Sequence, residues 1–439
     1  MGGGLMQLVA YGAQDVYLTG NPHITFFKVV YRRHTNFSME CIEQTWNGSS
    51  LEPGRCTATI SRNGDLVHKM YIEAIYDNYT PSISIAQIIN DVEIEIGGQS
   101  IDKHSGVFMM TWNELTHTCG IGVTRPTSNV GSTTGTLFQQ MSGAQGFANQ
   151  ARFIPLNFWF CKNPGSALPL IALQYHEVKV ILNHRMGSVR VRGSMAYVTS
   201  NKLWVDYIYL DTDERRRFAQ VSHEYLIEQV QEQILEEQAG EQDLRFNHPV
   251  KELIWVATQQ SVIGAISSDS VMTHPVVKRS DIADTTYTLK LNGQDRFSAR
   301  PHTYFSRVQI YQHHSGDGGD NSYQIWGTAQ DEVGWLAQVG APPVDDFTIQ
   351  RAMGYIQDSI CVYSFALNPE EHQPSGTCNF SRIDTVSFSS NKTISHTRGR
   401  TMNGDGGLAL DAEQEPVIFA INYNVLRIMS GMGGLAYSN

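Results

Sequence analysis

Short runs of alternating apolar and polar residues recur along most of this chain. From Gln174 to Leu182 the even-numbered residues form one face, and the other face carries Glu177 and Lys179. The run Phe153–Phe160 alternates in the same way, with apolar residues at its even-numbered positions. A period of two is that of a half-buried β-strand. The two runs lie on either side of Asn163-Pro164, so they predict two packed strands with a turn between them.

The same period predicts strands in both halves of the chain, and few stretches favour a helix. Val107–Leu115 could form a short helix. Asp211–Gln220 begins with acidic residues and continues with arginines, an order that suits a capped helix. The predicted strands are Thr25–Arg33, Met39–Trp46, Arg55–Ser61, His68–Ile75, Asp91–Ile96, Lys202–Asp211, Glu224–Leu235 and Val417–Ile428.

Segments rich in glycine and small polar residues interrupt the strands and are predicted to be long loops. They cover residues 104–150, 183–200, 298–359 and 389–414, and the third contains Asp345–Tyr355, which has helical potential. Loops of this length in a compact domain are usually functional or form contact surfaces. Residues 1–25 are predicted to be an arm, and the small residues of 429–439 a tail.

Several local patterns occur twice, in the same order, about 200 residues apart. A Gly-Gln turn follows IEIG and recurs after LKLN, and an Asn-Pro pair follows a strand in both halves. The separation between equivalents grows steadily, as expected for two copies of one fold of which the second has longer loops. The structural turn candidates are Asn163, Pro164, Asn368, Pro369, Gly98 and Gly293.

Many short strands with turn signals between them and long loops are typical of a jelly roll. We therefore predict an all-β chain with two consecutive β-sandwiches of the eight-stranded jelly-roll type, long loops and a few short helices. The predicted boundaries are an N-terminal arm at 1–25, jelly roll 1 at 26–212, a linker at 213–222 and jelly roll 2 at 223–439.

The composition is that of a globular protein, since the 439 residues are 41% hydrophobic and 17% charged. The formal net charge of -11 comes without a long basic run, so direct binding of nucleic acid through its phosphates is not expected. The six cysteines have neither zinc-site nor disulfide-framework spacing. The start of the chain lacks a signal-peptide pattern and no apolar run is long enough to span a membrane, so we expect folding in a reducing cytosol.

No residue pattern points to catalysis, a cofactor or a bound metal. A cupin-type metal site needs histidines on one strand face, whereas the neighbours in His313-His314 would point to opposite faces, and His176-Glu177 has the same defect. Glu93 and Glu95 share a strand face, which more often faces solvent than a glycosidase cleft. We therefore predict no catalytic, cofactor-binding or metal residues and expect these histidines to be surface or satisfied core residues.

Five asparagines stand in glycosylation sequons, namely Asn36, Asn47, Asn78, Asn379 and Asn391. Because no signal peptide is expected, chance occurrence is the preferred interpretation. They are kept as candidates for surface glycans.

Several longer segments carry specific patterns, namely Leu8–Phe37, Ser61–Leu66, Val92–His104, Ala167–Val180, Trp204–Ala219, His223–Gln231, Leu291–Phe297, Gln373–Asp384 and Asn422–Tyr437. These segments resemble the major capsid proteins of large nucleocytoplasmic DNA viruses, most closely the algal, chlorella-virus-like type. The resemblance spans both copies and both ends of the chain, and it is weakest in the four predicted loops.

The resemblance implies a double jelly roll and a structural protein rather than an enzyme. It implies a homotrimer that forms a pseudo-hexagonal capsomer and tiles an icosahedral shell beside neighbouring capsomers. Minor capsid proteins, an internal viral membrane and residues 1–25 would lie on the inner side, and the long loops would face outward. It also implies a place in the virion capsid, with synthesis and assembly in the host cytoplasm.

Two other classes stay open on the residues alone, a β-sandwich that binds or cleaves carbohydrate and a cupin-type metalloenzyme. Size in solution discriminates between them, because a stable trimer without metal or hydrolase activity favours the capsid protein. A monomer with stoichiometric metal favours the cupin, and thermal stabilisation by a sugar favours the carbohydrate-binding sandwich.

Overall fold

The computed structural model describes residues 33–77, 85–117, 151–191, 194–236, 239–256, 285–316, 360–392 and 416–437, with a few single residues outside these ranges. Residues 38–439 form one compact unit and residues 1–37 another. The predicted arm at 1–25, the predicted strand Thr25–Arg33 and the predicted helix Asp345–Tyr355 lie wholly or mostly outside the described residues.

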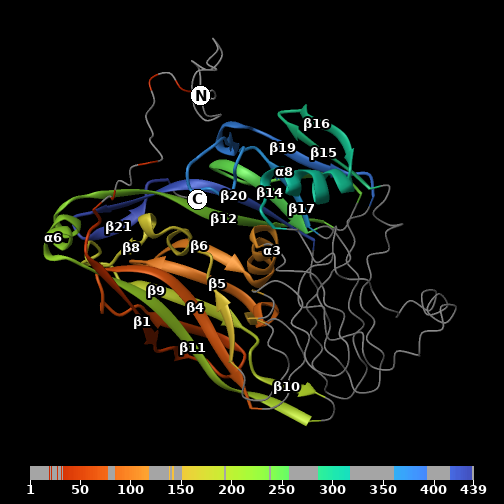
Figure 1. The fold of residues 1–439 in the computed structure, drawn as a ribbon. Coiled ribbons are helices and arrows are strands. Elements are labelled where there is room, and N and C mark those ends of the chain that lie inside the picture. Colours follow the sequence, from red (N-terminus) through yellow and green to blue (C-terminus); the bar gives the residue numbers. More distant parts are fainter. Residues whose placement is uncertain are drawn as a thin grey trace, which may run out of the picture. The chain divides into compact units, whose positions relative to one another are not determined.

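Two antiparallel sheets contain the strands of the first half of the chain (Figure 1). One has the order β1-β11-β4-β7, with β10 on β11 and β8 on β4, and the other has the order β2-β3-β9-β5-β6. The strands are β1 Phe37–Gln44, β2 Asn47–Gly48, β3 Gly54–Thr59, β4 Leu66–Tyr76, β5 Ile89–Ile96, β6 Gln99–Ser105, β7 Ala151–Pro155, β8 Leu168–Pro169, β9 Val178–His184, β10 Ser188–Val191 and β11 Ser194–Leu210.

Two further antiparallel sheets contain the strands of the second half. One has the order β12-β20-β14-β17, with β21 on β20 and β18 on β14, and the other has the order β13-β19-β15-β16. The strands are β12 His223–Ile234, β13 Gly240–Asp243, β14 Pro249–Val256, β15 Thr286–Leu291, β16 Gln294–Pro301, β17 Ile360–Ser364, β18 Cys378–Asn379, β19 Val386–Ser390, β20 Val417–Met429 and β21 Met432–Leu435. In the part of the chain that the structure describes, no sheet contains strands of both halves. Two consecutive β-sandwiches are therefore confirmed.

Short helices connect these strands. They are η1 Ile85–Ile88, α3 Gly106–Thr116, α5 Trp159–Lys162, η2 Pro164–Ser166, α6 Thr212–Gln220, η3 Tyr304–Val308, α8 Gln309–His313 and η4 Phe380–Arg382. The Ser105 hydroxyl accepts a hydrogen bond from the Phe108 N–H at the start of α3, and the Asp211 carboxylate accepts one from Thr212 at the start of α6. Helix α6 connects the two sandwiches, while the predicted domain boundaries around it remain a prediction.

One hydrophobic core runs through the first sandwich and continues into the second. The predicted inward residues Val92, Ile94 and Ile96 are fully buried, as their period of two requires. The same core cluster includes Phe108 of α3 and Phe419 of β20, whose rings meet edge to face with centroids 5.3 Å apart. Helix α3 is buried on nearly every side, which is typical of a helix inside a core.

The second sandwich has its own core between its two sheets. Trp255 lies at its centre, with ring centroids 5.3 Å from Tyr287, 5.1 Å from Phe305 and 5.1 Å from Phe388. Aromatic pairs in this geometry add to the stability from area burial alone.

The predicted single strand Phe153–Phe160 is wrong. Strand β7 ends at Pro155, and α5 begins at Trp159. Proline has no N–H to donate to a ladder, so it suits the end of the strand. The even-numbered residues are nevertheless all buried, because the segment after Pro155 turns into the core.

Parts of the four predicted loops are regular structure instead. Residues 183–200 contain the end of β9, all of β10 and the start of β11, and residues 104–105 are the end of β6. The short helix predicted at Val107–Leu115 is confirmed by α3. Strand β10 pairs only with β11 among the described strands, so it does not need the apolar pattern of a central strand. The segment 298–316 contains the end of β16, then η3 and α8, and β19 extends to Ser390.

The predicted tail at 429–439 also contains a strand. Residues 432–435 form β21, which pairs with β20 across a turn at Ser430-Gly431. Both turn residues have positive φ, which glycine adopts without strain.

Candidate functional site: the junction between the two sandwiches

Helix α3 of the first sandwich is held at its C-terminal end by the second sandwich. The carbonyl of Leu115 accepts a hydrogen bond of 2.7 Å from the Gly316 N–H, and the carbonyl of Thr116 accepts one of 3.0 Å from the Ser315 hydroxyl. These carbonyls belong to the last turn of a helix and have no partner within it. A segment about 200 residues away in sequence therefore completes this helix.

Beside α3, a carboxylate of the second sandwich lies between two lysines. Glu228 on β12 accepts from Lys162 at 2.9 Å and from Lys251 at 2.6 Å, each through a different oxygen. Lys162 ends α5 of the first sandwich, whereas Lys251 lies on β14. The Lys162 ammonium also lies 4.1 Å from the centre of the Trp112 ring, a cation–π contact.

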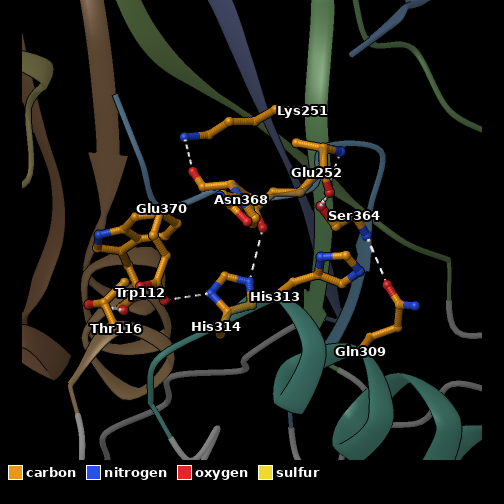
Figure 2. A network of polar contacts seen from close by, with 12 residues as sticks. Trp112, Thr116, Lys251, Glu252, Gln309, His313, His314, Ser364, Asn368 and Glu370 are labelled. Carbon is orange, nitrogen blue, oxygen red and sulfur yellow. Dashed lines mark hydrogen bonds and ion pairs between the residues drawn. The ribbon is translucent and has the colours of Figure 1, made fainter. Parts of the chain in front are cut away.

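A second charged group adjoins the first and is centred on a buried histidine. His314 lies between Glu252 and Glu370, with a ring nitrogen 3.0 Å from a carboxylate oxygen on each side (Figure 2). Its side chain and that of Glu252 are fully buried, and its ring meets the Trp112 ring edge to face. We call Lys162, Glu228, Lys251, Glu252, His314 and Glu370 together the charged junction.

The pKa values of Glu228 and His314 keep these two groups ionised at neutral pH. Burial alone would raise the pKa of Glu228, but the two lysines outweigh it and lower the pKa to about 2. Burial alone would lower the pKa of His314, but Glu252 and Glu370 outweigh it and raise the pKa to about 9. Both ring nitrogens therefore donate to carboxylates. Paired charges of this kind withstand burial, whereas a single one does not.

Next to the charged junction, β6 and β12 meet through side chains rather than through a ladder. The Val230 N–H donates to the Asp102 carboxylate at 3.1 Å, and the Gln229 amide donates to the Ile101 carbonyl. Asp102 is itself buried, 2.8 Å from His104. Side chains thus satisfy backbone groups that would otherwise be left unpaired where the two sandwiches meet.

The C-terminal hairpin makes a third set of contacts with the first sandwich. The Tyr175 N–H donates to the Gly431 carbonyl at 3.0 Å, and His176 lies 3.0 Å from the Gly433 carbonyl. The Leu435 N–H donates to the Gln99 side chain at 3.3 Å. An added Cβ on Gly433 would lie 2.7 Å from the Leu173 side chain, so a larger residue does not fit there without a shift.

The chemistry available at the charged junction is electrostatic. Among the residues that the structure describes, no group of three or more His, Cys, Asp or Glu could hold a metal ion. No described helix is long and apolar enough to cross a membrane. Ion pairs and capped backbone groups from both sandwiches meet here, so this region joins them.

The predicted Asn-Pro turns both lie at the charged junction. Asn163 caps η2, where its side chain accepts from Gly165 and Pro164 takes the first position. This turn begins directly after Lys162. In the second copy the Pro369 carbonyl accepts from Lys251 at 2.5 Å, and the Asn368 N–H donates to Ser375. Lys162, directly before the first turn, and Lys251, the donor to the second turn, thus both donate to Glu228.

The two predicted turn glycines lie in equivalent hairpins. Gly98 connects β5 to β6 with φ 85°, and Gly293 connects β15 to β16 with φ 76°. The residue before each also has positive φ, as two-residue hairpin turns of this kind require.

The sequon asparagines fall in different places. Asn36 and Asn47 are exposed, and Asn78 lies outside the described residues. Asn379 and Asn391 are exposed too, but their side-chain oxygens accept hydrogen bonds from Ser381 and Thr286. A glycan at Asn379 or Asn391 would be attached to a side chain that already accepts a hydrogen bond from the backbone of a turn or a strand.

The sequence patterns did not point to the charged junction. His314 is a satisfied core residue, one of the two outcomes expected for it, and His176 holds the C-terminal hairpin. Glu228, Lys162 and Glu370 look like ordinary surface charges in the sequence. A local signal exists at Lys251-Glu252, two charges inside the otherwise apolar strand PVKELIWV, because such charges are rarely buried unless they are paired.

Family models match both halves of the chain. The model described as "Major capsid protein N-terminus" matches residues 25–211. The model described as "Large eukaryotic DNA virus major capsid protein" matches residues 214–324 and 353–434. Each half of the duplicated architecture is thus matched by its own model.

Individual relatives match over the full length. The chain is 48% identical over 451 residues to the major capsid protein of Pyramimonas orientalis virus, and 39% identical over 487 residues to that of Paramecium bursaria Chlorella virus 1. Both matches cover all of this chain and all of the relative. A chain in a quasi-atomic model of the PBCV-1 virus capsid matches with a TM-score of 0.66 at 32% identity, covering 94% of this chain and all of that one. This likeness confirms the double jelly roll.

Proposed function

Because this chain belongs to the family of major capsid proteins of large eukaryotic DNA viruses, we propose that it builds the icosahedral outer shell of such a virus. The observation that carries the proposal is the match of both halves, each of which forms one β-sandwich. Its role is structural, and the buried ion pairs serve to join the sandwiches rather than to catalyse a reaction.

The duplicated fold supports a trimeric capsomer. Two similar sandwiches in one chain, repeated three times around an axis, approximate six-fold symmetry and pack on a hexagonal lattice. Permanent interfaces of this kind usually bury more than about 2,000 Å² and are fairly apolar. Exposed apolar side chains that could contribute to such interfaces include Tyr311, Tyr175 and Leu367.

The proposed partners follow from a place in the shell. They are two further copies of the chain, neighbouring capsomers, minor capsid proteins and an internal viral membrane on the inner side, and surface glycans. Direct contact with nucleic acid is not part of the proposal, because the net charge is -11. The proposed location is the virion capsid, after synthesis and assembly in the host cytoplasm.

Light scattering after size exclusion tests the proposal. A particle of three times 49.1 kDa that gives six-lobed images by electron microscopy is the expected result. A monomer at micromolar concentration that carries stoichiometric metal, or that a sugar stabilises against heat, would overturn it in favour of an enzyme or a carbohydrate-binding protein.

A further inference from the structure

We propose that Lys162 is a positioning residue, which fixes one sandwich relative to the other so that three chains can close into a capsomer. This inference rests on the trimeric capsid function proposed above. It assigns to one ion pair within the chain a role in assembly between chains.

The contacts of Lys162 come from both sandwiches. Trp112 on α3 of the first sandwich lies 4.1 Å from its ammonium, and Glu228 on β12 of the second lies 2.9 Å away. The ammonium is thus held between a ring face and a carboxylate that belong to different sandwiches. A charge-assisted hydrogen bond depends on distance and direction, whereas apolar burial does not.

The other contacts described between the sandwiches are ring packing and hydrogen bonds to backbone groups, whereas Lys162 and Glu228 form an ion pair between two side chains. The contact between Phe108 and Phe419 is apolar, and apolar surfaces can slide with a small loss of area. The polar contacts at Val230 on β12 and at Tyr175, in the segment before β9, lie along the same interface. A loosened charged junction would therefore allow a range of orientations without unfolding either sandwich.

Orientation matters because both sandwiches of each chain would contact neighbouring copies in a trimer. If the competent orientation is populated only part of the time, the apparent affinity between chains falls by that fraction. Trimer formation should therefore weaken under conditions in which each sandwich stays folded.

Lys162 can be changed without leaving a buried charge unpaired. A quarter of its side chain is exposed, and Glu228 keeps Lys251 at 2.6 Å within the second sandwich. Lys162→Met removes the positive charge, and Lys162→Glu places a second negative charge beside Glu228. Lys162→Arg keeps the positive charge.

A matched control exists within the first sandwich. Lys202 also lies 2.9 Å from a carboxylate, that of Glu43, and its ammonium is 5.7 Å from the Trp204 ring. All these partners belong to the same sandwich. Lys202→Met therefore removes an equivalent pair of contacts without touching the interface between sandwiches.

Hydrogen exchange with mass spectrometry, combined with light scattering, tests the inference. In Lys162→Met we expect the amides of Val230 and Gly316 to exchange about tenfold faster, while amides in the β4 and β20 ladders keep their rates. The trimer fraction should fall in the order Lys162→Arg, Lys162→Met, Lys162→Glu. Lys202→Met should change neither quantity.

Two outcomes would overturn the inference. One is that Lys162→Met shows faster exchange at Val230 and Gly316 but keeps the trimer fraction of the wild type. The other is that Lys162→Glu leaves the exchange rates of these amides unchanged. If the wild-type chain does not trimerise, the proposed function fails, and with it the assembly role of Lys162. Failure of the inference alone is recognised by a wild-type trimer that all Lys162 variants retain.

Discussion

Gly316 of the second sandwich donates its N–H to the carbonyl of Leu115, 2.7 Å away in the last turn of helix α3 of the first sandwich. The approach is so close that a side chain would not fit, since an added Cβ would lie 2.5 Å from that same carbonyl oxygen. Backbone atoms cannot move aside as a flexible side chain can. The close contact of the two sandwiches at this point therefore depends on glycine.

Replacing Gly316 by alanine should weaken this contact. The added methyl group forces either α3 or the segment after α8 to shift, at a cost of about 1–3 kcal/mol in the free energy of unfolding. Urea unfolding followed by tryptophan fluorescence measures the change. Gly165→Ala is the control, because an added Cβ there approaches only the Asn163 side chain, from 3.3 Å. Equal midpoints for Gly316→Ala and the wild type would contradict the structure.

The stability of the chain should decrease between about pH 6.5 and pH 9 because of His314. The pKa of His314 is raised from 6.5 to about 9 in the folded chain, so its contribution is complete below pH 6.5 and is lost as the pH rises through 9. The contribution is on the order of 3 kcal/mol. Chemical unfolding at a series of pH values measures this slope.

His314→Gln should remove that part of the pH dependence, because glutamine does not titrate. It should also destabilise the chain at neutral pH, since the buried Glu252 loses its charged partner. His372→Gln, at an exposed histidine two residues after Glu370, is the control and should keep the wild-type slope. The assignment fails if His314→Gln and the wild type lose stability in parallel across this range.

The sequence predicts the architecture well because the architecture depends on local pattern. Strand β5 buries one face, and such a face produces alternation that is visible in a single chain segment. The repeated hairpin turns at Gly98 and Gly293 and the repeated Asn-Pro pairs indicate the duplication for the same reason. Strand β10 is harder to predict, because an edge strand does not need an apolar face.

The charged junction depends on contacts that a local pattern does not contain. Lys162 and Glu228 are separated by 66 residues, and Glu252 and His314 by 62. A lysine or glutamate is usually exposed, so each of them taken alone indicates surface. The same holds for Gly316, since a glycine in a Gly- and Ser-rich segment suggests a loop rather than a close approach to a helix.

Glu228→Gln should destabilise the chain far more than the removal of a surface ion pair. It leaves Lys251 fully buried without a carboxylate, which costs about 3–5 kcal/mol, whereas Glu43→Gln breaks an exposed pair and should cost less than about 1 kcal/mol. Urea unfolding at pH 7 measures both changes. Similar values for the two variants would show that the Glu228 pair is not buried as described.

Glu228 should also make the stability of the chain depend on pH in acid. Its pKa is lowered from 4.5 to about 2, so its contribution is complete above pH 4.5 and is lost as the pH falls toward 2. Between these values the wild type should lose stability more steeply than Glu228→Gln. Parallel curves for the two chains in this range would contradict the lowered pKa.

The two Asn-Pro turns should differ in their coupling to the charged junction, although they are equivalent in the repeat. Pro369 presents its carbonyl to Lys251, whereas the carbonyl of Pro164 accepts from Ala167 within its own turn. Replacing either proline by glycine frees the backbone of the unfolded chain and should lower the free energy of unfolding by about 1 kcal/mol, with a lower yield of soluble trimer in both cases.

Combined with Lys251→Met, however, Pro369→Gly should lower the free energy of unfolding by less than the sum of the two single changes, because the Pro369 carbonyl has already lost its donor. Pro164→Gly with Lys251→Met should be additive, and additivity in both pairs would remove Pro369 from the charged junction.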